Sequence, residues 1–257
     1  VSTVYANTDV IIQANTGGVT SLQWNFSKDG TITFPNGAVI KDTTGESVSF
    51  GQSAGATSQG SSAVAIGHNA GVTSQGTFTV AIGRNAGQTS QGGGAVAVGV
   101  SAGDGSQGAQ AVAVGNGAGG TSQGNSAVAI GISAGQSTQG VDAVAIGNSA
   151  GSLTQGMSSI AIGKNAGRNF QGNNTIILNA TGDALEQTTA NTFTVSPVRN
   201  DVANVAQILF YNITTKEITY SNTINVAGNT TVGNLIISTG GTITGDAAAG
   251  NVSANAV

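Results

Sequence analysis

The sequence predicts an all-β protein organised around a parallel β-roll, a solenoid in which each coil adds strands to sheets shared with its neighbours. Residues 51–178 repeat a 16-residue pattern, Gly-x-x-Ala-Gly-x-x-x-Gln-Gly-x-x-x-Val-Ala-Ile, eight times without an insertion or deletion. Stacked coils require this strict phase, because an insertion would break the ladder between neighbours. The pattern also holds three glycines, which would cost a helix roughly 1 kcal/mol each, and known two-helix repeats are about twice as long.

Composition excludes several other classes of protein. The chain has 257 residues, 41 of them Gly, with no Cys, 7% charged residues and a net charge of -4. Its seven Lys and Arg residues do not cluster, which argues against nucleic-acid binding, and the lack of Cys excludes a disulfide framework. No apolar run is long enough for a membrane span, and Val1 opens no signal-peptide pattern. We therefore expect no membrane span and a start downstream of the native one.

Residues 1–50 are predicted to form a small N-terminal β module. Short alternating strands are expected at Val10–Ile12, Leu22–Phe26 and Thr31–Phe34, separated by the turn signals Lys-Asp-Gly and Pro-Asn-Gly.

Residues 51–178 are predicted to be the β-roll itself. In each unit the Val-Ala-Ile triplet, such as Val64–Ile66, alternates large and small apolar side chains, and we expect the large ones to point inward. A second extended segment runs through Ala-Gly-x-x-x-Gln, and the glycines permit the tight turns of a short coil.

Residues 179–223 are predicted to form a module of short strands. Strands are expected at Thr192–Val195, Gln207–Tyr211 and Glu217–Tyr220, the last two joined as a hairpin. Residues 224–257 are an irregular segment rich in Asn, Thr and Gly that we expect to continue beyond Val257.

A roll this thin is expected to associate with copies of itself. Each coil contributes one pair of Val or Ile residues plus alanines, which is too little apolar area to offset the entropy of ordering 16 residues. The triplet is apolar on both faces of the strand, with Ala outward and Val or Ile inward or the reverse, as in a sheet buried on both sides. A trimer would bury the ladders that a monomer exposes.

The repeat resembles a known family. The segment Ser62–Ala70, Ser-Ala-Val-Ala-Ile-Gly-His-Asn-Ala, and its seven counterparts are similar to the head repeats of YadA-like trimeric autotransporter adhesins. That resemblance implies a left-handed parallel β-roll with three chains around a common axis. Outside the repeats, Trp24–Gly37 and Ile208–Tyr220 resemble segments of tail-fibre and other structural proteins of bacteriophages and large aquatic viruses. No coiled-coil stalk follows the repeats, which departs from the bacterial adhesins and favours a viral fibre.

Two sets of repeated residues are predicted to be structural ladders rather than ligand sites. Stacked identical amides hydrogen-bond from coil to coil, and stacked apolar residues fill a sheet face. The amides are Gln59, Gln75, Gln91, Gln107, Gln123, Gln139, Gln155 and Gln171; the apolar residues are Val64, Ile66, Val80, Ile82, Val96, Val98, Val112, Val114, Val128, Ile130, Val144, Ile146, Ile160 and Ile162.

No residue set points to catalysis, a metal or a cofactor. The segment 115–120 fits Gly-x-Gly-x-x-Gly, but it lies inside a repeat with no following helix, so we interpret it as a coincidence. His68, the only histidine, occupies a variable and therefore solvent-facing position, without Cys or clustered carboxylates. Asp104 and Asp142, the array's only acids, lie in different coils and form no carboxylate pair for glycoside hydrolysis.

Ice binding is a further alternative, because a Thr-Ser pair recurs, as at Thr57-Ser58 and Thr73-Ser74. The pairs are not sustained along the array, and adjacent strand residues are expected to point to opposite faces, which leaves single rows.

The sequence therefore predicts a non-enzymatic, homotrimeric structural fibre protein that is extracellular, on a virion fibre or appendage. It would act as a rigid spacer, with host-surface glycan or protein and other fibre proteins contacted at its ends. The alternative is the head of a bacterial surface adhesin.

Overall fold

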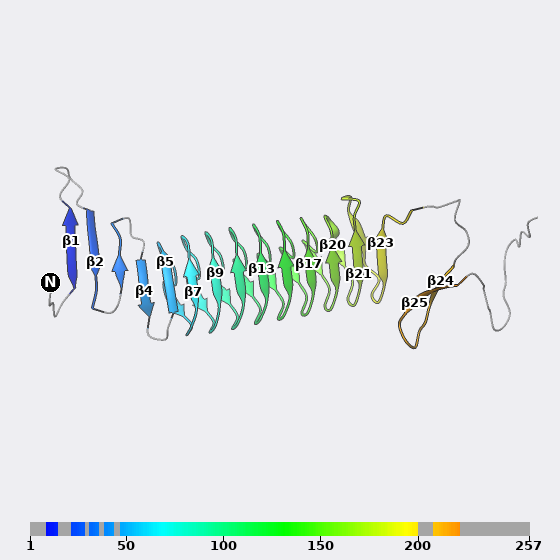
Figure 1. The fold of residues 1–257 in the computed structure, drawn as a ribbon, viewed down its shortest axis with the longest axis horizontal. Helices are drawn as coiled ribbons and strands as arrows, with labels where there is room; N and C mark the ends of the chain where they lie inside the picture. The colour runs from blue at the N-terminus through cyan, green and yellow to red at the C-terminus, as the bar shows by residue number, and fades with distance from the viewer. Residues whose placement is uncertain are drawn as a thin grey trace, which may run out of the picture. The chain divides into compact units, whose positions relative to one another are not determined.

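The computed structural model describes residues 9–14, 22–28, 31–35, 39–43, 47–199 and 208–221 (Figure 1). These residues form strands and turns and contain no helix, which confirms the all-β prediction. The chain divides into two units, residues 1–198 and residues 199–257.

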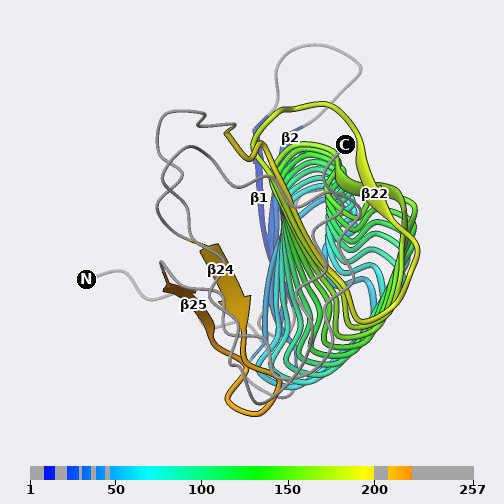
Figure 2. The same ribbon diagram turned by 90° about the vertical axis from the view of Figure 1, so that its right-hand side faces the viewer.

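The first unit is a parallel β-solenoid with a 16-residue repeat, as predicted. One flank of the coils forms part of a 14-stranded sheet, here called sheet A, and the other flank forms a nine-stranded sheet, sheet B. The coils, seen end on, lie one behind another in Figure 2. In sheet A the parallel strands are β5 (Ser47–Gly51), β7 (Val64–Ile66), β9 (Val80–Ile82), β11 (Val96–Val98), β13 (Val112–Val114), β15 (Val128–Ile130), β17 (Val144–Ile146), β19 (Ile160–Ile162), β21 (Ile176–Asn179) and β23 (Phe193–Ser196).

Sheet B lies across the interior from sheet A and is built from shorter strands. Its members are β6 (Thr57–Gln59), β8 (Thr73–Gln75), β10 (Ser90–Gln91), β12 (Ser106–Gln107), β14 (Ser122–Gln123), β16 (Thr138–Gln139), β18 (Thr154–Gln155), β20 (Ala166–Gln171) and β22 (Leu185–Gln187). Each Gln in these strands pairs with the Gln of the neighbouring strand, so sheet B keeps the register of the repeat.

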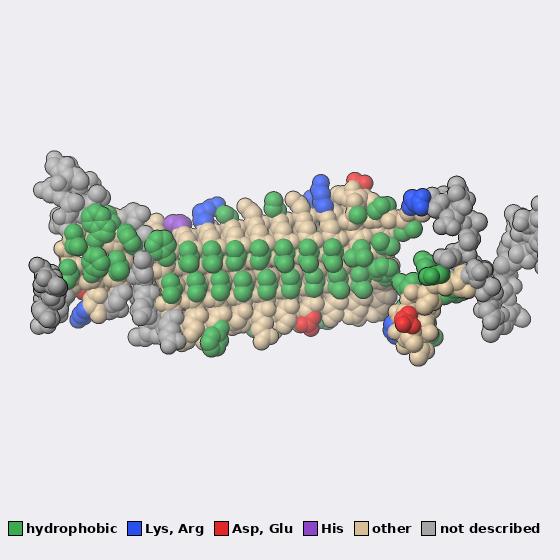
Figure 3. All heavy atoms as spheres, in the orientation of Figure 1, with side chains coloured by type: hydrophobic (Ala, Val, Ile, Leu, Met, Phe, Trp, Pro, Cys, Tyr) green, Lys and Arg blue, Asp and Glu red, His purple; other side chains and the backbone are tan. Residues whose placement is uncertain are grey.

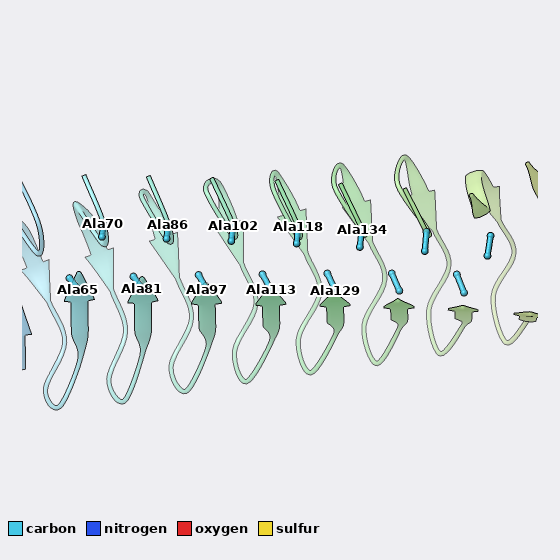
Figure 4. Close-up of a cluster of buried hydrophobic side chains, with 14 of the residues drawn as sticks. Ala65, Ala70, Ala81, Ala86, Ala97, Ala102, Ala113, Ala118, Ala129 and Ala134 are labelled. Atoms are coloured by element: carbon cyan, nitrogen blue, oxygen red, sulfur yellow. The ribbon is translucent and has the colours of Figure 1, made fainter. Parts of the chain in front are cut away.

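The prediction that the large side chains of the triplet point inward is wrong. Ala65, the middle residue of its triplet, is fully buried, whereas Val64 is half-buried and Ile66 is exposed. The alanines of sheet A face a second alanine row, which begins at Ala54, across the interior; Figure 4 labels this row from Ala70 to Ala134.

The narrow interior explains this orientation. A Cβ built on Gly87 would lie 3.3 Å from the Cβ of Ala81, which is already tight for two carbon atoms. A Val or Ile in the alanine row would overpack this space. Among the described residues, a large apolar side chain, Ile177, occupies the interior only at the last coils, beside Leu185.

The glycine that follows each triplet is required by the stacking of the coils, in addition to the tight turns for which the sequence predicts glycine. Gly83 has a φ of 124°, and a Cβ there would lie 2.5 Å from the carbonyl oxygen of Gly99 in the next coil. The Gly83 N–H in turn donates to the carbonyl oxygen of Ile66, 2.7 Å away, in the preceding coil. A side chain at this position would therefore force neighbouring coils apart.

The N-terminal strands extend sheet A but not sheet B. Strands β1 (Val10–Ala14), β2 (Leu22–Phe26), β3 (Ile32–Thr33) and β4 (Val39–Thr43) pair antiparallel in sequence order, and β4 pairs antiparallel with β5. The three predicted strands of this region are confirmed, and they belong to the same sheet as the repeats.

The solenoid also continues past residue 178. Strand β23, predicted as part of a later module, pairs parallel with β21, and Ile176 lies opposite Phe193, so this step is one residue longer than the repeat. Strand β22 continues sheet B with an irregular register.

In the second unit, β24 (Ile208–Tyr211) and β25 (Ile218–Ser221) form the predicted antiparallel hairpin. The predicted irregular segment 224–257 lies outside the described residues.

Candidate interaction surface

The outward side of sheet A from β5 to β23 carries two continuous rows of large apolar side chains, here called the ladder face. Its members follow the register in which each residue pairs with its counterpart one coil away. They are Val48, Phe50, Val64, Ile66, Val80, Ile82, Val96, Val98, Val112, Val114, Val128, Ile130, Val144, Ile146, Ile160, Ile162, Ile176, Leu178, Phe193 and Val195.

The ladder face is exposed in a single chain and carries no charge. Ile66 is 36% exposed and Phe193 is 54% exposed, and no residue of the ladder face is polar. The two rows run side by side along the array as unbroken lines of apolar side chains (Figure 3). A contiguous exposed apolar surface of this length marks an interaction site.

The antiparallel strands continue the ladder face toward the N-terminus. Directly paired residues of neighbouring strands share a face of the sheet. Phe26 lies opposite Ile32 and also opposite Val10, while Trp24 lies opposite Ile12. The backbone register through β4 carries this alignment to Phe50 of the ladder face.

No strand of sheet B lies behind β1–β4, because sheet B begins with β6. These antiparallel strands thus form a single layer within the described residues. On β1–β3 the apolar side is the one that continues the ladder face, with Ile11 and Asn25 alternating on the opposite side, whereas the register of β4 places Asp42 opposite Val48. A sheet of one layer whose one side is apolar needs another element packed against that side to be stable.

The predicted glutamine ladder lies inside the solenoid. From Gln75 to Gln171 these side chains are buried, and amide-to-amide hydrogen bonds join Gln75 to Gln91 (3.0 Å) and Gln91 to Gln107 (3.1 Å). A third such bond joins Gln139 to Gln155 (3.1 Å).

A second role of these amides was not foreseen from the sequence. Every one of the eight donates its Nε2 hydrogen to a carbonyl oxygen of sheet A, as Gln91 does to Val80 at 2.9 Å and Gln107 does to Val96 at 2.8 Å. The glutamines therefore tie sheet B to sheet A across the interior. The donor and the acceptor are always 11 residues apart in the sequence. This constant spacing is the feature from which the cross-sheet contact could have been predicted.

The corner residues are solvent-facing, as predicted. His68 and its counterparts Arg84 and Ile132 are exposed. Asp104 is partly buried, and this burial raises the pKa of its carboxyl group above the ordinary 3.8. No group of three or more His, Cys, Asp or Glu residues within the described ranges is arranged to hold a metal ion.

The segment 115–120, which fits the dinucleotide pattern, joins β13 to β14 and so leads from one strand to another. Among the residues that the structure describes, none belongs to a helix able to cross a membrane.

The hydroxyl side chains of sheet B form one exposed row that ends at Phe170. Thr57 and Ser58 are both exposed, contrary to the expectation of opposite faces, because Ser58 has a left-handed φ of 55°. The neighbouring row is interrupted at Gly105 and Leu153. The members of the unbroken exposed row are Ser58, Ser74, Ser90, Ser106, Ser122, Thr138 and Thr154.

Comparison with known proteins yields no match to any family model, curated protein or solved structure.

Proposed function

We propose that the chain is a non-enzymatic structural protein that assembles through the ladder face into a rigid homotrimeric segment of an extracellular fibre or appendage. The observation that carries this proposal is the position of the large apolar side chains: alanines lie in the interior, and Val and Ile lie on the outer face of sheet A. A protein that places its large apolar residues on one outer face is built to cover that face with a partner.

The energetics favour self-association. An interior of alanine and glutamine buries little apolar area per ordered residue, so the single solenoid gains little against conformational entropy. Each half-exposed Val or Ile of the ladder face would gain roughly 0.5–1 kcal/mol by losing its remaining contact with water. Summed along the array, association would supply the stabilisation that the interior lacks.

A second copy of this chain is the partner that fits best. The ladder face repeats with the coil spacing of about 4.8 Å, so a matching surface must be apolar and have the same period. Closed rotational symmetry lets every copy bury the same face against its neighbours. The trimeric count, the left-handed coil and the viral setting rest on the resemblance of the repeats to the adhesin heads and of the flanking segments to tail-fibre proteins.

The array would act as a spacer. Its exposed corners change from coil to coil, as from His68 to Arg84 to Asn116, and form no convergent polar site among the described residues. Host-surface contacts, with a glycan or a protein, would belong to the irregular ends, where three copies multiply weak contacts by avidity. A trimer of the solenoid alone is expected not to bind host cells that the complete fibre binds; retention of binding by this fragment would contradict the spacer role.

The alternative proposal is a bacterial surface adhesin head, which the same repeat motif supports. A membrane anchor encoded in the complete gene would decide for it.

Sedimentation of the full chain tests the assembly. We expect a species of three times 24.9 kDa for the native sequence. Ile130→Lys puts a charge on the ladder face and should abolish the trimer. Ile132→Lys, two residues further along the chain, is the matched control, because Ile132 is 56% exposed at a corner and should leave the trimer intact. A stable folded monomer of the native chain would overturn the proposal.

A further inference from the structure

The ladder face does not by itself specify one alignment with a partner, because its coils are alike. Val112 pairs with Val128 and Val128 pairs with Val144, so neighbouring coils present the same surface to a partner. A copy displaced by one or two coils would lose only the contacts of the terminal coils. Registers of nearly equal stability would then compete, as they do for repetitive strands.

Aromatic residues of sheet A occur, among its described strands, only at the two ends of this face. Trp24, Phe26 and Phe50 lie at the N-terminal end, and Phe193 lies at the C-terminal end. The eight strands between them, from β7 to β21, present only Val, Ile and Leu outward. Phe50 is 45% exposed and packs edge-on against Phe34, with ring centroids 6.1 Å apart.

The N-terminal strands also lack the period of the repeats. They run antiparallel, in pairs such as Val10 with Phe26, and no other part of sheet A has this arrangement. Their apolar side chains are continuous with the ladder face but differ in size and spacing from every coil. A partner shifted by one coil would meet Val or Ile where the aligned partner meets Trp or Phe.

We propose that the antiparallel strands β1–β4, with Trp24, Phe26 and Phe50 as anchors, set the register in which copies of the chain align along the ladder face. This proposal rests on the proposed self-assembly and adds to it a second function for the N-terminal strands. Large aromatic anchors contribute a disproportionate share of interface energy, and only the aligned arrangement buries all of them at once. The repeats supply the area of the interface, and the aromatic end makes one alignment better than its shifted alternatives.

Disulfide trapping in the full chain tests the proposal, because the native sequence has no Cys. Two differently tagged chains are co-expressed, one with Val96→Cys and one with Val128→Cys. These positions lie two coils apart, about 9.6 Å along the stack, whereas a disulfide requires Cα atoms within about 7 Å. An aligned assembly therefore forms bonds between like positions, and a bond between positions 96 and 128 reports a shifted one.

In the otherwise native chain we expect bonds between like positions and almost none between positions 96 and 128. Trp24→Ala should raise the shifted bond roughly tenfold, as expected for the loss of one anchor. Phe50→Ile, which gives β5 the outward pattern of the other coils and preserves folding, should raise it as well. Ile11→Ala is the control, because Ile11 is 54% exposed on the opposite side of the layer, and it should leave the pattern unchanged.

The outcomes separate the two proposals. If like positions still cross-link in the Trp24→Ala and Phe50→Ile variants while the shifted bond stays absent, assembly stands and the register proposal is wrong. A shifted bond already abundant in the native background would also overturn it. If no bond forms and the native chain sediments as a monomer, self-assembly itself fails.

Discussion

The two faces of sheet A share the same strands yet have opposite roles. The inner face holds alanines packed against the second alanine row, and the outer face holds Val and Ile in contact with water. The core of this thin solenoid is therefore defined by the separation of the two sheets rather than by the size of the apolar residues. The Val and Ile side chains, which do not fit between the two sheets, are available for contact with a partner.

The strongest challenge to this comparison is a charge on the inner face. Ala113→Asp places a carboxylate in a fully buried position, and we expect a loss of about 3–5 kcal/mol, enough to abolish folding of the array. The corner variant Asn116→Asp, three residues away and exposed, should have little effect. Thermal melts at equal chain concentration compare the two, and equal shifts would mean that the faces are assigned wrongly.

The next largest effect is expected where coils touch through backbone alone. Gly83→Ala would bring a Cβ to 2.5 Å from the carbonyl oxygen of Gly99 at a φ of 124°, so we expect a loss of about 2–3 kcal/mol. Gly93→Ala is the matched control, because its nearest neighbour, the Thr77 hydroxyl oxygen, would lie 3.6 Å away. Urea unfolding should separate the variants, and a harmless Gly83→Ala would show that the coils are free to move apart.

The glutamine row predicts a smaller effect. Gln91→Leu keeps the volume but removes hydrogen bonds to Val80, Ala95 and Gln107, and we expect a loss of about 1–2 kcal/mol. Gln136→Leu, at an exposed position, serves as the control in the same unfolding experiment. If both variants unfold at the same urea concentration, the cross-sheet bonds contribute nothing to stability.

The smallest effect concerns Asp104, whose carboxyl pKa is raised by burial. The protonated form is favoured in the folded state, so its contribution is fully present below pH 3.8 and is lost as pH rises through the raised value. Asp104→Asn should therefore stabilise the protein at neutral pH by less than about 1 kcal/mol, since solvent screens the group. Melting curves recorded against pH should show this gain disappearing in acid; a gain independent of pH would exclude the mechanism.

Much of the fold could be predicted because the repeat is visible in the residues themselves. A strict 16-residue period with a strand triplet dictates parallel in-register pairing, and the pairing of Val96 with Val112 and Val80 follows from it. The hairpin of β24 and β25 was also predicted, from its alternating residues and its Asn-Ile-Thr-Thr-Lys connection.

The extent of sheet A could not be predicted, because the strands at its two ends do not follow the 16-residue repeat. Strand β23 enters the stack with one extra residue, and β1–β4 join the sheet antiparallel. No local signal in either segment says which edge of which sheet it will pair with, since that choice depends on an open strand edge formed by distant residues.

By itself the sequence determined the repeating unit, the parallel stack and the need for glycine in the tight turns, because each of these follows from the period and from local backbone chemistry. Only the tertiary structure decided which side of the Val-Ala-Ile strand faces inward. A strand with apolar residues on both faces is compatible with either orientation, and the choice depends on how closely the second sheet approaches. The cross-sheet bonds of Gln91 and its counterparts hold that sheet near, so the middle residue of the triplet is alanine from β7 to β19, and the Val and Ile side chains form the outer surface.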